Sequence, residues 1–129
     1  MEMMRIEDTI LKNLIFNDEY TRKALPYIKT EYFSEHNDRY LFNEIEKYVN
    51  AFNVLPTQEA LIIEIGNNTS ISEQQFDIVS KKVAEFFNSK ENTETAWLLE
   101  TTEKFCQEKF LYGTTVDEEV VQTGEKSSE

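Results

Sequence analysis

Apolar residues recur at intervals of three and four positions along most of the chain, which is the spacing of amphipathic α-helices. The first such stretch covers residues 3–16, and Asn17-Asp18 then predicts a break and the N-cap of a short second helix. Pro26 falls near the end of that helix, and residues 29–37 are expected to form a connector with one turn around Tyr32. Alternating strand patterns are absent, so the pattern indicates an all-α protein.

Residues 37–52 predict the clearest amphipathic helix of the chain. One side carries an apolar stripe made of Leu41, Ile45, Tyr48, Val49 and Phe52. The opposite side carries charged residues that are expected to face solvent, namely Asp38, Arg39, Glu46 and Lys47. The acidic pair Glu44 and Glu46 is also expected on a solvated face, because charged side chains are rarely buried.

Capping residues mark two further helices. Thr57 is expected to cap a short helix over residues 58–65, with Gly66 as its C-terminal stop. Ser72 and Gln75 have the spacing of a capping box, which predicts a helix from there to about Asn88. The apolar residues that this helix is expected to bury are Phe76, Val79, Val83, Phe86 and Phe87.

The last helix is expected to cover residues 93–121, with Asn92 or Thr93 as its cap and a disordered tail over residues 122–129. Its apolar positions are Trp97, Leu98, Phe105, Phe110, Leu111, Tyr112 and Val116. A single acidic helix cannot bury such a row by itself, so the row indicates a partner helix. The prediction is a compact helical head of about five helices in residues 1–92, followed by a long stalk or oligomerisation helix.

The net charge of the chain limits the classes of ligand that it is expected to bind. The formal net charge is −12, and phosphate binding requires clustered Lys and Arg, so we expect no tight direct binding of DNA by this segment. The charge fits a basic partner surface, and it also fits a plain role in solubility. The apolar runs are short and the first residues lack the order of a signal peptide, so we expect no membrane segment and a cytoplasmic location.

Sequence motifs for catalysis or cofactor binding are absent. The chain has neither the glycine-lysine loop that cradles phosphates nor a glycine-rich dinucleotide loop, and one His and one Cys cannot build a typical zinc site. His36 is interpreted as a solvated or capping residue, and Cys106 as a small, buried or half-buried apolar one. We therefore expect no catalytic residues, no cofactor and no metal, and a chain that is not an enzyme by itself.

Five strings carry a resemblance to a known family. They are Ile6 to Asp18, Tyr27 to Phe33, His36 to Val49, Val54 to Thr57, and Trp97 to Phe105. In this order and at these intervals they resemble the N-terminal domain of DnaB-type replicative helicases, especially the version from T-even-like bacteriophages. The resemblance covers roughly residues 5–116.

The resemblance implies a helical head followed by a helical hairpin, of which residues 93–121 would be the first arm. It implies the collar of a hexameric ring, stacked on a RecA-like motor, that self-associates and engages a primase or helicase loader. The parent protein would be an ATP-dependent DNA helicase, in a bacterial host cell if phage-encoded. The second arm and the motor are missing from this sequence, so the chain is expected to be either an excised domain or a stand-alone relative.

The aromatic and apolar row of the last helix is our candidate oligomer interface, since Trp and Tyr are typical interface anchors. It consists of Trp97, Phe105, Phe110, Leu111, Tyr112 and Val116. The alternative for this row, and above all for Trp97, is that the side chains fold back on the head as ordinary core. The alternative for the whole chain is a free-standing acidic adaptor or nucleic-acid mimic that binds a basic partner surface with a strong dependence on salt.

Overall fold

The computed structural model describes residues 5–68, 70–89 and 93–113, and this part of the chain contains helices and no strand. The α-helices are α1 (Ile6–Phe16), α2 (Asp18–Ala24), α3 (His36–Phe52), α4 (Gln58–Asn67), α5 (Glu73–Asn88) and α6 (Thr95–Glu108). Two 3-10 turns, η1 (Leu25–Tyr27) and η2 (Thr30–Tyr32), connect α2 to α3, and α6 continues into a π-helical turn, η3 (Lys109–Gly113). The all-α fold class predicted from the sequence is confirmed.

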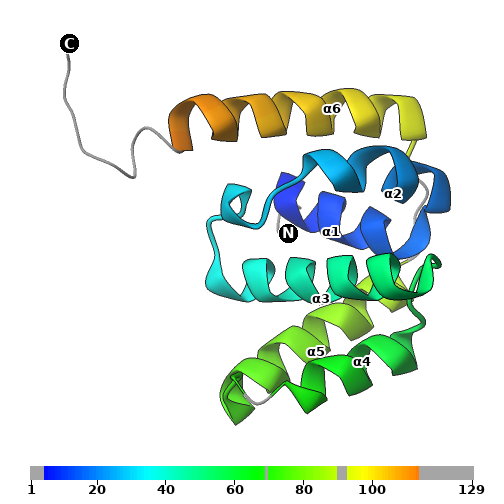
Figure 1. The fold of residues 1–129 in the computed structure, drawn as a ribbon, viewed down its shortest axis with the longest axis vertical. Helices are drawn as coiled ribbons and strands as arrows, with labels where there is room; N and C mark the ends of the chain where they lie inside the picture. Colours follow the sequence, from blue (N-terminus) through cyan, green and yellow to red (C-terminus); the bar gives the residue numbers. More distant parts are fainter. Residues whose placement is uncertain (1–4, 69, 90–92, 114–129) are drawn as a thin grey trace.

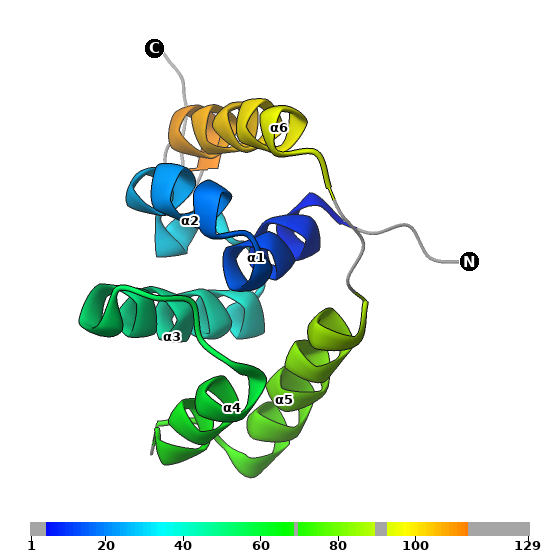
Figure 2. The same ribbon diagram turned by 90° about the vertical axis from the view of Figure 1, so that its right-hand side faces the viewer.

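The helices stack in an order that differs from their order along the chain (Figures 1 and 2). α6 lies along α2 at one end, α1 and α3 pack together in the middle, and α4 and α5 pair at the other end. The last helix therefore returns to the second one, and the termini of the described chain lie nearer to α6 than to the α4–α5 pair.

One continuous core holds the six α-helices together. Its largest apolar members with almost no exposure are Tyr20, Phe33, Phe42, Ile10, Leu11, Leu14, Leu41, Ile45, Leu61, Ile65 and Leu98. Phe33, just after η2, packs between two rings that are far apart in sequence, with centroid distances of 5.2 Å to Phe42 and 6.0 Å to Phe105. Leu98 and Phe105 of α6 belong to this same core, so α6 is packed as part of the head.

The capping residues of three helices are those predicted from the sequence. The Asn17 side chain accepts a hydrogen bond from the backbone N–H of Tyr20, and Thr57 accepts one from Ala60. Ser72 and Gln75 form the complete capping box, in which each side chain accepts a hydrogen bond from the other residue's backbone N–H, at 3.1 Å in both directions. These interactions span three residues, which is why sequence alone could locate them.

Two predicted helix ends are wrong. α4 continues through Gly66 to Asn67, and Gly66 has no positive φ. A Cβ at Gly66 would lie 3.2 Å from the Phe76 ring, so the glycine makes room for α5 rather than ending α4. α6 begins at Thr95 with Glu94 as N-cap and no side-chain cap hydrogen bond, so neither Asn92 nor Thr93 caps it. α3 ends at Phe52 as predicted, with Asn53 as its C-cap in the left-handed region (φ 60°), a conformation that Asn tolerates.

Two acidic residues of α3 that were expected to face solvent are buried. Asp38 is 1% exposed and accepts hydrogen bonds from Arg5 Nη2 at 2.8 Å and Lys82 Nζ at 2.7 Å. Asp8 pairs with the same two cations, so an ion cluster joins the starts of α1 and α3 to the middle of α5. Glu44 is also buried. Burying a carboxylate costs free energy of desolvation. Ion pairs with cations and hydrogen bonds from amides offset this cost.

Candidate interaction surface on α6

The inward face of α6 fixes the helix to the head. Leu98, Thr102 and Phe105 follow one another at helical spacing and are all buried. The Tyr20 and Thr102 hydroxyls lie 2.7 Å apart in this contact, and Asn17 Nδ2 donates to Thr95 Oγ1 at 3.0 Å. Phe105 is 6% exposed, so its side chain is part of the core rather than of a free surface. Phe105 is therefore not available for contact with another subunit.

Three other members of the predicted interface remain exposed to solvent. Trp97 is 50% exposed, Phe110 is 62% exposed and Leu111 is 57% exposed. Trp97 does not fold back into the core, although it lines a groove of about 430 Å³ together with Ile6 and Thr9 of α1. The Tyr112 side chain and Val116 lie outside the described part of the structure, as do residues 114–121 of the predicted stalk and the predicted tail over 122–129.

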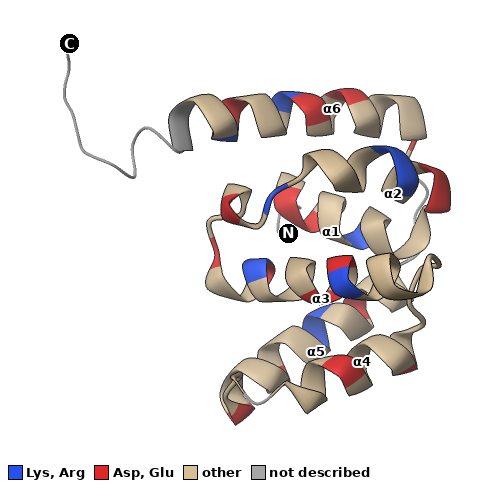
Figure 3. Ribbon diagram, in the orientation of Figure 1, with Lys and Arg blue, Asp and Glu red and all other residues tan. Residues whose placement is uncertain are grey.

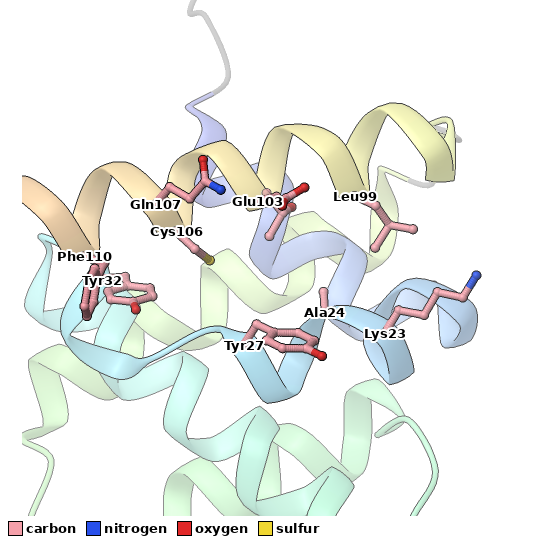
Figure 4. A pocket seen from close by; sticks show the side chains of 10 residues that line it. Lys23, Ala24, Tyr27, Tyr32, Leu99, Glu103, Cys106, Gln107 and Phe110 are labelled. Carbon is pink, nitrogen blue, oxygen red and sulfur yellow. The ribbon is translucent and has the colours of Figure 1, made fainter.

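A second, larger hollow of about 590 Å³ lies on the other flank of α6, against α2 and η1 (Figure 4). Leu99 and Cys106 point into it from α6, and Tyr27 lies across from them. Tyr32 and Phe110 close one end with their rings side by side. Its walls are mostly apolar carbon, so a binding partner would gain free energy chiefly by covering apolar surface.

Cys106 in this hollow is half-buried and neutral. Burial raises the pKa of its thiol to about 11, so the reactive thiolate is scarce at neutral pH. The interpretation of Cys106 as a small, half-buried apolar residue agrees with this environment. Tyr32, beside it, also has a raised pKa, because of burial and then the nearby Cys106 and Glu31.

The backbone widens from an α-helix to a π-helical turn where α6 reaches this hollow. Lys109–Gly113 form this turn, and Lys109 Nζ lies 5.7 Å from the centre of the Phe105 ring. This turn carries Phe110 and Leu111, which are the most exposed large apolar residues among the described side chains of α6 and the turn. Wide turns of this kind are rare and often occur at functional sites.

Charged residues of both signs run along α6 beside these apolar groups (Figure 3). Glu100 and Lys104 form an exposed pair at 3.8 Å, which contributes little to stability. An apolar centre with a charged rim is the usual composition of a protein–protein interface. Within the described ranges, no helix has the length and apolar character to cross a membrane, and no three His, Cys, Asp or Glu residues gather as metal ligands.

Sequence reasoning missed one member of this surface. Tyr27 is 74% exposed and lines the hollow opposite α6, although it had been assigned only to a connector string. The signal available was Pro26 immediately before it, because proline favours a tight turn that can present the next side chain outward.

Comparison with known proteins identifies a relative. Over 108 residues, or 84% of this chain, the sequence is 30% identical to the DnaB-like replicative helicase of Enterobacteria phage T4. The chain is similar to a phage DnaB-like helicase. The resemblance predicted from the five strings is thus confirmed, and no family model matches the chain. The chain spans 22% of the length of this helicase.

Proposed function

We propose that this chain is the N-terminal collar domain of a phage DnaB-like replicative helicase. In this role the domain brings subunits together through the outer face of α6, and it docks a primase or helicase loader. The parent protein would be an ATP-dependent DNA helicase that works in the cytoplasm of the bacterial host. The observation that carries the proposal is the 30% identity to the phage T4 helicase over 84% of the chain.

The surface of α6 supports the assembly part of the proposal. Trp97, Phe110 and Leu111 are exposed on one helix and its terminal turn, beside hollows that could receive apolar side chains of another subunit. Exposed aromatic residues next to concave apolar surface are typical anchors of subunit contacts. The net charge of −12 supports protein partners over DNA as the direct ligand of this segment.

Sedimentation equilibrium of the 129-residue chain tests the assembly. We expect the wild type to self-associate, and the double variant Phe110→Ser and Leu111→Ser to weaken that association by about tenfold or more. Phe52→Ser is the matched control, because Phe52 is 60% exposed but lies at the end of α3. A wild type that stays monomeric, or a control that weakens association equally, would refute an interface on α6.

Fluorescence gives an independent readout, since Trp97 is the single tryptophan of the chain. Its half-exposed ring should emit at a long wavelength in dilute solution and at a shorter one when the chain associates. Emission that does not change across the range of association would place Trp97 outside the contact.

The acidic adaptor remains the second candidate, because the same net charge would suit a protein that occupies a basic groove. An immunoblot of producing cells with antibody against this chain separates the two. A band several hundred residues longer supports a collar attached to a motor domain. A band at 15.2 kDa would instead support the free-standing adaptor.

A further inference from the structure

A small pocket of about 290 Å³ lies between α3 and α4, far from the α6 surface. The side chains that line it are Glu44, Lys47, Tyr48, Ala51 and Phe52 of α3, with Glu64 of α4. The Tyr48 and Phe52 rings lie 4.7 Å apart, and Phe52 is 60% exposed. The pocket therefore combines two carboxylates with an aromatic wall. Its size suits a single side chain, because pockets for whole small molecules begin at about this volume.

Glu44 is the unusual residue of this pocket. Its Oε2 accepts a hydrogen bond from Asn68 Nδ2 at 3.1 Å and forms an ion pair with Lys47 Nζ at 3.3 Å. Its Oε1 is buried and has no hydrogen-bond partner among the residues that the structure describes. A carboxylate oxygen without a donor in a buried site costs free energy, so such an oxygen marks a place where a donor would bind favourably.

Lys47 covers this carboxylate only loosely. Its side chain is 68% exposed, while that of Glu44 is 3% exposed, so the ammonium group can move into water at little cost. A cation with more donors than an ammonium group could then approach Glu44 from the pocket. Glu64 would remain beside it as a second carboxylate, with Lys47 no longer offsetting the charge.

We propose that this pocket binds the guanidinium group of an arginine side chain presented by a partner protein, with displacement of Lys47. A guanidinium group has five donors in a plane, so it can pair with carboxylates and stack on an aromatic ring at the same time. The Tyr48 and Phe52 rings supply the stacking surface. The chain's net charge of −12 favours the approach of a basic partner segment.

The position of the pocket leaves it accessible when α6 is covered. α4 and α6 lie at opposite ends of the helix stack, with α1, α2 and α3 between them, in both views of the fold (Figures 1 and 2). The inference thus goes beyond subunit assembly and supplies the chemistry of a docking partner. Because binding and sedimentation are measured separately, either proposal can fail without the other.

Titration of the 129-residue chain with N-acetyl-arginine amide, followed by amide chemical shifts in NMR spectra, tests the proposal. We expect saturable shifts at Tyr48, Phe52 and Glu64, weaker shifts with N-acetyl-lysine amide, and none with the neutral N-acetyl-norleucine amide. Glu64→Gln should lower the affinity for the arginine probe by about threefold or more. Lys47→Met should raise it by a similar factor, because it removes the competing cation.

The opposite directions of these two variants separate binding from damage to the fold, since both positions are exposed. The Phe110→Ser and Leu111→Ser variant should bind the arginine probe like the wild type. Three results would overturn the proposal: no saturable shift with the arginine probe, equal shifts with the norleucine probe, or unchanged affinity in both Glu64→Gln and Lys47→Met. Shifts at the same amides with calcium chloride but not with arginine would also overturn it, because the carboxylates would then bind a metal ion.

Discussion

The hydroxyl contact between Tyr20 and Thr102 joins α2 to α6 across 82 positions of sequence. Both residues are buried, with 0% and 4% of their surface exposed, and their hydroxyl oxygens lie 2.7 Å apart. Thr102→Val keeps the shape of the side chain but removes its hydroxyl, which leaves the Tyr20 hydroxyl without a partner in a dry site. We expect this variant to lose about 2 kcal/mol of unfolding free energy, within the range for an unsatisfied buried hydroxyl.

Tyr20→Phe should cost less, about 1 kcal/mol. The Thr102 hydroxyl lies within a helix, so it can turn to donate to the backbone carbonyl of Leu98, four residues earlier. The double variant removes both hydroxyls and leaves two apolar groups in contact, so it should unfold within about 1 kcal/mol of the wild type. The two single losses would then exceed the double loss, which is the signature of a direct interaction.

Urea unfolding followed by circular dichroism measures these free energies, and the dependence on urea should have the same slope in every variant. Thr101→Val is the matched control, because Thr101 is the neighbouring threonine of α6 but faces the groove beside Trp97. We expect it to change stability by less than about 0.5 kcal/mol. Strict additivity of the single losses, or a Thr102→Val variant as stable as the wild type, would refute the reasoning.

Three further predictions concern local structure and charge. Ser72→Ala should lower the unfolding free energy by about 1 kcal/mol in urea, because the capping box is lost, and an unchanged value would mean that the cap does not stabilise α5. Burial raises the pKa of Asp8, but ion pairs with Lys82 and Arg5 outweigh burial and hold it below its ordinary value. Its stabilising contribution is therefore present above the ordinary pKa and lost as pH falls through the lowered one. Asp8→Asn should thus cost about 1 kcal/mol at neutral pH and progressively less below about pH 4, and a pH-independent loss would contradict this. Iodoacetamide should alkylate Cys106 about tenfold more slowly in the folded than in the urea-unfolded chain at about pH 8, as followed by mass spectrometry, because burial raises the thiol pKa to about 11; equal rates would contradict it.

Sequence reasoning succeeded where the deciding interaction is local. The capping side chains of Asn17, Thr57 and Ser72 each accept a hydrogen bond from a backbone N–H three residues later. Both partners therefore lie within one short stretch of sequence. The spacing of apolar residues predicted the helices and therefore the all-α fold class. Gly66 was misread because its role comes from Phe76 of the next helix, which no local pattern reveals.

Burial of charge could not be predicted from spacing. Asp38 lies on the face of α3 that looks solvated, but its partners Arg5 and Lys82 are 33 and 44 positions away. Only the tertiary packing of α1 and α5 on α3 brings them together. Glu44 is a similar case, since Asn68 meets it from 24 positions along the chain. The candidate arginine site could therefore not have been found from the sequence.

The two-sided character of α6 was predicted only in part. The exposed positions Trp97, Phe110 and Leu111 were expected, but the buried stripe on the opposite face contains a threonine at its centre. Thr102 is polar in sequence, and it is buried because Tyr20 supplies its hydrogen bond. Because a threonine interrupts the apolar pattern, the sequence does not reveal which face of α6 packs on the head. Phe105 was therefore assigned to the interface and not to the core.

The position of the Phe33 ring between Phe42 and Phe105 has a consequence for the synthesis of the protein. During translation Phe42 is synthesised shortly after Phe33, whereas Phe105 is synthesised only after α4 and α5. Until then the nascent chain carries an open apolar face on α2, which is a site for aggregation or for a chaperone. α6 closes this face with Leu98, Thr102 and Phe105, while Trp97 and Phe110 stay at least half exposed. In the proposed assembly, contact between subunits through α6 would therefore begin only after this last helix has been synthesised and packed on the head.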